Sequence, residues 1–390
     1  MLKIILCCFF SLSCAASLYA APYIPSSPAQ VLEKLPANSV TYSTEFRALR
    51  NVLNTDPNNI LVATQLATLY IERSRSEGDP RYLGYAQAAL APWWTLKAPP
   101  IDVLVLRATI LQSTHHFDES LSDLNQVLKL DPKNGQAWIT KATILQVQAN
   151  YKEAYESCRP LYNLTAPLIT LTCLTNIQHL NGQAQKSYSK LKVGYAESGE
   201  MNPSIDVWVL TLLAEMATRL DDIKAAEQYF KQAIKIEEPD SYLLGAYSDF
   251  LLDQQRPQEV IELLKTKTRI DALLLRYIEA LKEVHSPETF QQIDMLKQRF
   301  DAATMRGDTV HQREQSRFEL RLMQNPKKAL QIAQLNWQKQ KEPADARIFL
   351  ESAIAAKDKA AMQTIMQWLA STHLEDVALT KIMTKYKSAS

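Results

Sequence analysis

The sequence predicts an all-α protein built from repeated helix pairs, and three observations support that fold class. Glycine accounts for only 8 of the 390 residues, which is about 2% against a usual ~7%. Hairpins and phosphate-binding loops need more glycine, because they use positive φ angles. Apolar residues recur at helical spacing, and one block of sequence repeats at a fixed offset. Together these features favour a helical repeat protein.

The first residues of the chain are typical of an export signal. Lys3 supplies a positive charge, residues 4–10 are apolar, and small residues lead to Ala20. We therefore expect residues 1–20 to be a cleaved signal peptide, and the protein to reach the periplasm of a Gram-negative bacterium. A retained anchor is the alternative, while a lipoprotein signal would need a leucine where Ser11 stands. Residues 21–45 are rich in proline and serine and suit an extended tether or a plain linker.

The charge balance argues against nucleic acid as a partner. The chain has 43 Lys and Arg against 42 Asp and Glu, and removal of residues 1–20 takes away only Lys3, which leaves 42 of each. Without a basic excess the chain lacks the electrostatic footprint that attracts phosphates or anionic lipids. The overall composition, 46% apolar and 22% charged, excludes disorder of the whole chain.

An internal repeat defines the organisation of the chain. Residues 108–112 recur unchanged as residues 142–146, and 142 minus 108 gives a period of 34. A third copy begins at Ala67, which lies 41 residues before Ala108, so the first repeat holds a seven-residue insertion. The turn-forming sequence Gly78-Asp79-Pro80 places this insertion within residues 75–81.

Each repeat is predicted to be a helix pair. Apolar residues at helical spacing run through 104–111 and 117–128, with a polar break at 113–116. Pro132 then separates two repeats, because proline cannot continue a helix but suits its first turn. The small residues Ala108 and Ala142 should let neighbouring helices approach closely.

This pattern resembles the tetratricopeptide repeat family, although Lys141 stands where an apolar residue is usual. The resemblance implies a right-handed superhelical solenoid of antiparallel helix pairs over residues 46–270, with no cofactor and with a protein or peptide as partner. The matching residues are Ala108, Phe117 and Pro132 in one repeat, Trp138, Ala142, Tyr151 and Ala154 in the next, and Leu213, Ala214, Ala226, Phe230, Ala233 and Pro239 in a later one.

The last part of the chain, residues 271–390, keeps helical spacing but loses the clear period. We interpret it as degenerate repeats that end in a polar cap, with a separate helical domain as the alternative. The expected helices lie near 312–323, 326–339, 344–356, 360–371 and 375–387.

The candidate binding site is a stripe on the first helices of the repeats, which line the concave surface in the resembled family. Only one stripe residue is charged, whereas family members that clamp acidic tails carry Lys and Arg there. We therefore expect neutral hydrogen bonding to an extended peptide, with an unliganded, solvated surface as the alternative. The stripe comprises Thr64, Thr68, Thr109, Gln112, Thr143, Gln146, Asn176 and Glu215.

No catalytic signature is present in the sequence, which has no Walker loop, dinucleotide fingerprint, nucleophile elbow or zinc-protease motif. The adjacent His115 and His116 should point in different directions, so a metal site is not expected. The sequence thus predicts an exported, non-catalytic scaffold. The alternative is an accessory factor that handles lipid or glycan in the cell envelope.

Two cysteines remain once residues 1–20 are removed. Cys158 is expected in an interior position on a second helix, and Cys173 on the concave stripe of the following first helix. Their side chains should diverge, whereas a disulfide needs Cα atoms within about 7 Å. We therefore expect no disulfide, with Cys173 the more accessible thiol.

Overall fold

A computed structural model describes residues 27, 44–199 and 201–389, so the expected signal peptide and nearly all of the expected tether lie outside it. The described residues form 21 α-helices and one 3-10 turn, without any strand. The all-α prediction is confirmed. In this part of the chain, no helix combines the length and apolar character needed to cross a membrane.

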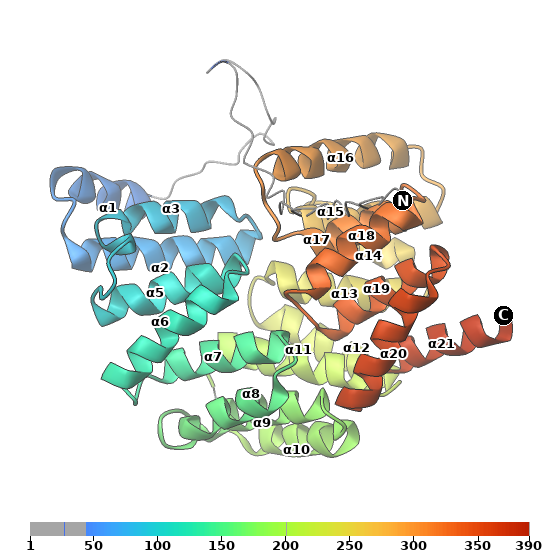
Figure 1. The fold of residues 1–390 in the computed structure, drawn as a ribbon, viewed down its shortest axis with the longest axis horizontal. Coiled ribbons are helices and arrows are strands. Elements are labelled where there is room, and N and C mark those ends of the chain that lie inside the picture. Colours follow the sequence, from blue (N-terminus) through green and yellow to red (C-terminus); the bar gives the residue numbers. More distant parts are fainter. Residues whose placement is uncertain (1–26, 28–43, 200, 390) are drawn as a thin grey trace, which may run out of the picture.

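The helices are arranged as consecutive pairs (Figure 1). The first five pairs are α2 (Ile60–Glu77) with α3 (Arg81–Ala89), α5 (Ile101–Ser113) with α6 (Phe117–Leu130), α7 (Gly135–Val147) with α8 (Tyr151–Cys158), α9 (Pro167–His179) with α10 (Ala184–Glu197), and α11 (Pro203–Arg219) with α12 (Ile223–Ile236). The next four are α13 (Ser241–Asp253) with α14 (Pro257–Leu264), α15 (Asp271–Glu283) with α16 (Thr289–Met305), α17 (Gln312–Arg321) with α18 (Pro326–Trp337), and α19 (Pro343–Ala355) with α20 (Lys359–Thr372). The remaining elements are α1 (Thr44–Thr55), α4 (Ala91–Trp94), the 3-10 turn η1 (Arg159–Asn163) and α21 (Val377–Ala389).

The pairs stack into a solenoid with a continuous inner layer. Each first helix contacts the first helix of the next pair, from α5 through α7, α9, α11, α13, α15 and α17 to α19. In Figure 1 the pairs run from α1–α6 on the left, through α8–α10 at the bottom, to α13–α20 on the right. The alanines at the predicted close approaches, Ala108, Ala142 and Ala154, are buried, as tight helix packing requires.

The turns between paired helices explain how the chain manages with so little glycine. Each of the nine turns within a pair contains one residue with positive φ, and only Gly78 and Gly182 among these nine residues are glycines. Elsewhere the left-handed conformation is adopted by residues such as Ala149, at φ 62°, which costs backbone energy. The same turn geometry is therefore built repeatedly from non-glycine residues.

The predicted insertion in the first repeat has a structural role. Helix α2 has 18 residues, whereas α5 and α7 have 13 each. The longer α2 reaches α13, where the Ser241 hydroxyl donates to the Arg75 carbonyl oxygen at 3.2 Å. Arg269 also lies 3.9 Å from Glu77. The start of the solenoid is thereby joined to its middle.

The prediction about the cysteines was wrong. Cys158 and Cys173 form a disulfide, with Cα atoms 5.8 Å apart, and both residues are buried. Helix α8 ends at Cys158, and η1 then turns the chain back so that both elements pack against α9. Cys173 consequently faces the core between the two repeats rather than the concave surface.

The C-terminal helices α17–α21 confirm the five helical segments expected after residue 311. They have a core of their own, in which Trp337 packs edge-on against Phe349 and Trp368, with ring centroids 5.6 and 5.1 Å away. The helices nevertheless continue the stacking order, because α17 contacts α15 and α19 contacts α17.

Candidate functional site

The predicted stripe residues all lie on the first helices α2, α5, α7, α9 and α11, but they differ in exposure. Thr68 and Thr143 are exposed, and Thr109 is buried with 6% of its surface accessible. The other five residues, Thr64, Gln112, Gln146, Asn176 and Glu215, are half-buried. Thr109 therefore contributes little to the surface of the stripe.

The threonine hydroxyls of the stripe bind their own helices. Thr143 donates to the Ile139 carbonyl oxygen at 3.0 Å, and Thr109 donates to that of Val105 at 2.8 Å. Thr64 and Thr68 make the same type of bond, each at 2.9 Å. Because their protons are used within the helix, these hydroxyls offer an external ligand mainly acceptor lone pairs.

Two hydrogen bonds join stripe residues to the next repeat. The Asn176 side-chain amide on α9 donates to Gln146 Oε1 on α7 at 3.0 Å. The Tyr242 hydroxyl on α13 donates to Glu215 Oε1 on α11 at 2.9 Å. Tyr242 exposes 57% of its surface and was not in the predicted stripe. Its position in the first turn of a first helix, next to the Pro239 boundary, is the sequence signal that could have identified it.

The C-terminal helices pack along the turns of the earlier repeats, which the sequence did not predict. The Lys341 amide donates to the Val147 carbonyl oxygen at 2.8 Å, at the end of α7. Glu375 Oε1 accepts from the Ala184 amide at 3.1 Å, and Lys381 pairs with Asp221 at 3.0 Å. The C-terminal third thus borders one edge of the inner surface.

The inner helices of the second half carry a dense network of ion pairs. Asp249 on α13 pairs with Arg276 and Arg317, each at 2.6 Å. Arg317 also binds Glu279 on α15 at 2.6 Å. The network continues through Arg321–Glu279, Arg321–Glu351, Arg347–Glu351, Arg347–Asp253, Arg313–Asp345 and Arg313–Glu342. Successive repeats are therefore tied together by charge.

The electrostatic environment separates two kinds of carboxylate. Burial alone would raise the pKa of Asp249, but Arg276 and Arg317 outweigh it and hold that pKa below its usual value. Glu279 behaves in the same way beside Arg317 and Arg321. Burial raises the pKa of Glu215, whose only hydrogen-bonding partner in the described chain is the Tyr242 hydroxyl. Glu215 is thus, like Glu314 on α17, a carboxylate here that makes no ion pair with an arginine of the described chain.

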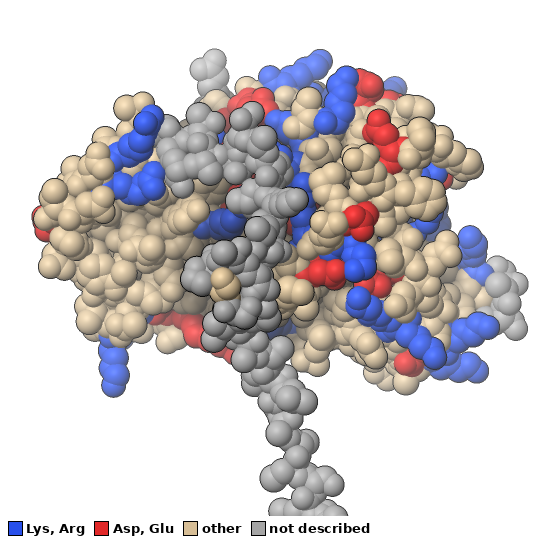
Figure 2. Space-filling view, turned by 90° about the horizontal axis from the view of Figure 1, so that it is seen from above, with Lys and Arg blue, Asp and Glu red and all other residues tan. Residues whose placement is uncertain are grey.

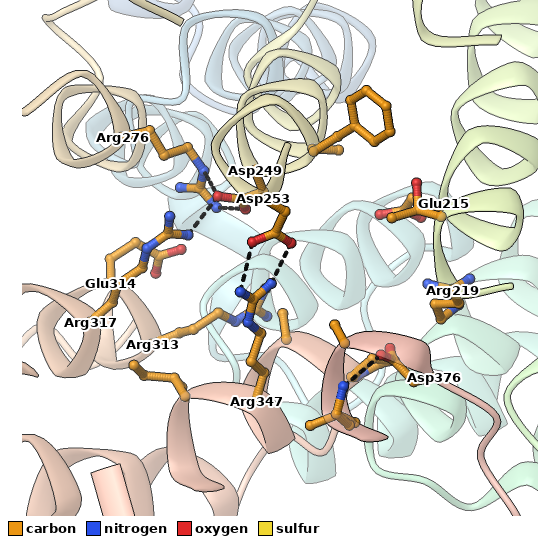
Figure 3. Close-up of a pocket in the computed structure, with 18 of the residues that line it drawn as sticks. Glu215, Arg219, Asp249, Asp253, Arg276, Arg313, Glu314, Arg317, Arg347 and Asp376 are labelled. Atoms are coloured by element: carbon orange, nitrogen blue, oxygen red, sulfur yellow. Dashed lines mark hydrogen bonds and ion pairs between the residues drawn. The ribbon is translucent and has the colours of Figure 1, made fainter. Parts of the chain in front are cut away.

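These residues surround a cavity of about 180 Å³ (Figure 3). Its walls come from α11, α13, α15, α17, α19 and the start of α21. The labelled arginines and acids of Figure 3 point toward the cavity from several helices. The apolar part of the lining includes Phe230, Phe250 and Leu379.

The two halves also differ at the outer surface. Figure 2 shows Lys, Arg, Asp and Glu side chains interspersed on the right, and more uncharged surface on the left. Within the described residues, no group of three or more His, Cys, Asp and Glu side chains is placed to hold a metal ion.

One helix pair matches a known repeat family. Residues 209–240, which include most of α11 and all of α12, match the family model of the tetratricopeptide repeat. This is the repeat for which the sequence pattern gave Leu213, Ala226 and Phe230 as matching positions. The all-α solenoid of stacked helix pairs therefore contains a tetratricopeptide repeat.

Comparison with solved structures gives only distant matches. A tetratricopeptide repeat protein from Parabacteroides merdae is 15% identical with a TM-score of 0.40, over 65% of this chain and 91% of that chain. Human IFIT1, as a dimer with m7Gppp-AAAA, is 12% identical with a TM-score of 0.42, over 90% and 87%. Yeast Tom70 is 13% identical with a TM-score of 0.34, over 83% and 61%. No curated protein sequence matches the chain.

Proposed function

We propose that the protein is an exported, non-catalytic scaffold that binds an extended peptide or protein segment on the inner surface of its first repeats. One observation carries the proposal: the first helices form a continuous inner layer, and the stripe residues of α2, α5, α7 and α9 are all neutral. Thr68 and Thr143 face solvent, and the Asn176–Gln146 hydrogen bond spans two successive repeats. Such a surface can hydrogen-bond a peptide backbone.

The charge distribution favours a neutral peptide over an acidic tail. No arginine or lysine is among the stripe residues of α2 to α9, and the arginines further along are mostly bound to carboxylates. A clamp for acidic chains would need free cations on the inner surface. Binding to the proposed surface should accordingly depend little on salt concentration.

Two features support export. Residues 1–20 have the composition of a signal peptide, and the Cys158–Cys173 disulfide suits an oxidising compartment. Fractionation of producing bacteria tests this part of the proposal. A periplasmic protein whose first residue is Ala21 is expected, whereas a cytoplasmic protein that retains Met1 would contradict export.

A random peptide library tests the binding function. The wild-type protein should select extended peptides, and the triple variant Thr143→Ala, Gln146→Ala, Asn176→Ala should lose at least tenfold in affinity for them. A matched control replaces Gln185 and Ser189, two neutral residues exposed on the outer helix α10, and should bind normally. An empty peptide selection, together with binding of lipid vesicles or glycans in a separate assay, would support the accessory-factor alternative instead.

A further inference from the structure

The cavity in Figure 3 has one wall on which every lining arginine is paired with a carboxylate. Its arginines on α15, α17 and α19 each have at least one carboxylate partner, as in Arg276–Asp249 at 2.6 Å and Arg347–Asp253 at 2.6 Å. These bonds fix both partners, because a guanidinium and a carboxylate that face each other satisfy their hydrogen bonds mutually. The paired groups of this wall therefore supply shape rather than free binding groups, and Glu314 on α17 is its one lining charge that makes no ion pair among the described residues.

The opposite wall, on α11, contains an arginine without a partner. Within residues 44–199 and 201–389, Arg219 makes no ion pair, and its Nε atom is buried without a hydrogen-bond acceptor. The acid on which Arg219 acts electrostatically is Glu215, and no hydrogen bond joins the two side chains. Arg219 as a whole is half-buried, but a buried N–H without an acceptor is itself costly.

A carboxylate of opposite charge lies one helical turn before this arginine. Glu215 and Arg219 both line the cavity from α11 and are not within ion-pair distance of each other. Glu215 Oε1 accepts only the Tyr242 hydroxyl, at 2.9 Å, which leaves acceptor capacity on the carboxylate. The α11 wall thus presents a cation and an anion on residues four apart, whose Cβ atoms usually lie about 5–6 Å apart.

We propose that this cavity binds a small zwitterion, a free α-amino acid with an aliphatic side chain, with its carboxylate on Arg219 and its ammonium group on Glu215. The lining supplies a matching surface for the side chain in Phe230, Phe250 and Leu379. The volume of about 180 Å³ is below the ~300 Å³ at which drug-sized ligand pockets begin, so the ligand must be small.

Other ligands fit the charges less well. A phosphate would be repelled by Glu215, Glu314 and Asp376, which also line the cavity. A simple cation would leave Arg219 without a counter-charge, and an uncharged molecule would leave both groups unmatched. A zwitterion compensates both at once.

Calorimetric titration of the full-length protein with L-alanine, L-valine and L-leucine tests the proposal. At least one should bind, and Arg219→Gln and Glu215→Gln should each weaken it at least tenfold, as expected for loss of a charge-assisted hydrogen bond. The control is Arg159→Gln, an exposed arginine outside the cavity, which should bind as wild type. Circular dichroism should show that all three variants are folded.

Analogues of L-valine test whether both charged groups of the ligand are needed for binding. Valinamide lacks the carboxylate and N-acetylvaline lacks the ammonium group, so each should bind at least tenfold more weakly than valine. Equal or tighter binding of N-acetylvaline, inorganic phosphate or the peptide N-acetyl-Ala-Ala-Val would overturn the proposal, as would an absence of binding by all three amino acids. The triple variant at Thr143, Gln146 and Asn176 should bind valine normally, so this test is independent of peptide binding.

Discussion

The two halves of the solenoid use the same helix pair but differ on their inner surfaces. Helices α5, α7 and α9 present neutral groups such as Thr143, Gln146 and Asn176. Helices α13, α15, α17 and α19 present arginines and carboxylates bound to one another, as in Arg317 with Asp249 and Glu279. The repeat backbone therefore does not dictate the chemistry of the inner surface, and each half can serve a separate purpose.

A net charge near zero does not mean that the protein has few charged residues. The chain is close to neutral overall, yet the network of the second half contains nine ion pairs. Eight of them join different inner elements, some as far apart in the stack as α13 and α19, and only Arg347–Glu351 joins residues four apart in one helix. Local compensation thus allows a highly charged interior in a protein of ordinary composition.

The largest expected effect comes from breaking the charged network. Arg317→Gln should lower the free energy of unfolding by about 3 to 5 kcal/mol, because it breaks two largely buried ion pairs and leaves Asp249 with Arg276 alone and Glu279 with Arg321 alone. Urea unfolding measures the change. The control Arg159→Gln removes an exposed pair with Glu156 and should have no measurable effect. A loss below 1 kcal/mol for Arg317→Gln would mean that the network does not stabilise the second half.

The neutral half should depend on its disulfide instead. Replacing Cys158 and Cys173 together with alanine should cost roughly 3 kcal/mol, the chain-entropy value for a loop of about 15 residues. Unfolding of the wild type with and without reductant gives an independent measurement. If the double variant and the reduced protein were as stable as the oxidised wild type, the disulfide would have no structural role.

Acid should destabilise the two halves in different pH ranges. Burial, together with the nearby charge of Arg219, lowers the pKa of His179 to about 3, so the folded state keeps this imidazole neutral. Below pH 6.5 the unfolded chain binds a proton that the folded chain excludes, and stability falls as the pH drops toward 3. Between pH 6.5 and 5 the expected loss is about 2 kcal/mol.

The variant His179→Gln isolates this effect. Its stability relative to wild type should improve by about 2 kcal/mol as the pH falls from 6.5 to 5, and the same substitution at the exposed His285 serves as the control. The carboxylates with lowered pKa, such as Asp249 and Glu279, contribute stability above their ordinary pKa that is lost only in stronger acid. If the stability of His179→Gln depended on pH between 6.5 and 5 as that of the wild type does, the loss of stability in this range would not come from His179.

The smallest expected effect concerns the turn between paired helices, which has the same geometry in both halves. Ala149 has φ 62°, a conformation that glycine adopts without the steric cost of a Cβ atom. Ala149→Gly should therefore stabilise the protein by about 1 kcal/mol, measured as a higher midpoint of urea unfolding. The same change at Ala196, exposed within α10, should destabilise it by about 1 kcal/mol. Destabilisation at both sites would show that the turn is not strained by alanine.

The sequence predicted the parts of this fold that depend on local pattern. The exact repeat of residues 108–112 at 142–146 fixes the helix pairs, and Ala142 is buried as its position in the repeat requires. The disulfide was missed because η1 redirects the chain after Cys158, and a repeat template contains no such turn. The stripe was placed on the correct helices, although the burial of Thr109 depends on neighbours that the template does not specify.

The cavity could not be predicted for a different reason. Its charged groups lie mainly on α13, α15, α17 and α19, in and next to the region where the period is blurred. Pairs such as Arg347–Asp253, 94 residues apart in the chain, depend on the curvature of the whole solenoid. Periodicity within one repeat carries no information about that curvature.

Photo-crosslinking in the producing cells tests the central claim most directly, namely that a peptide or protein partner binds the neutral inner surface. A crosslinking amino acid would replace the exposed Thr143 on the inner helix α7 or, as the matched control, the exposed Ser189 on the outer helix α10. We expect a defined polypeptide adduct from position 143 and none from position 189. Adducts from position 189 alone, or adducts of lipid or glycan at position 143, would contradict it.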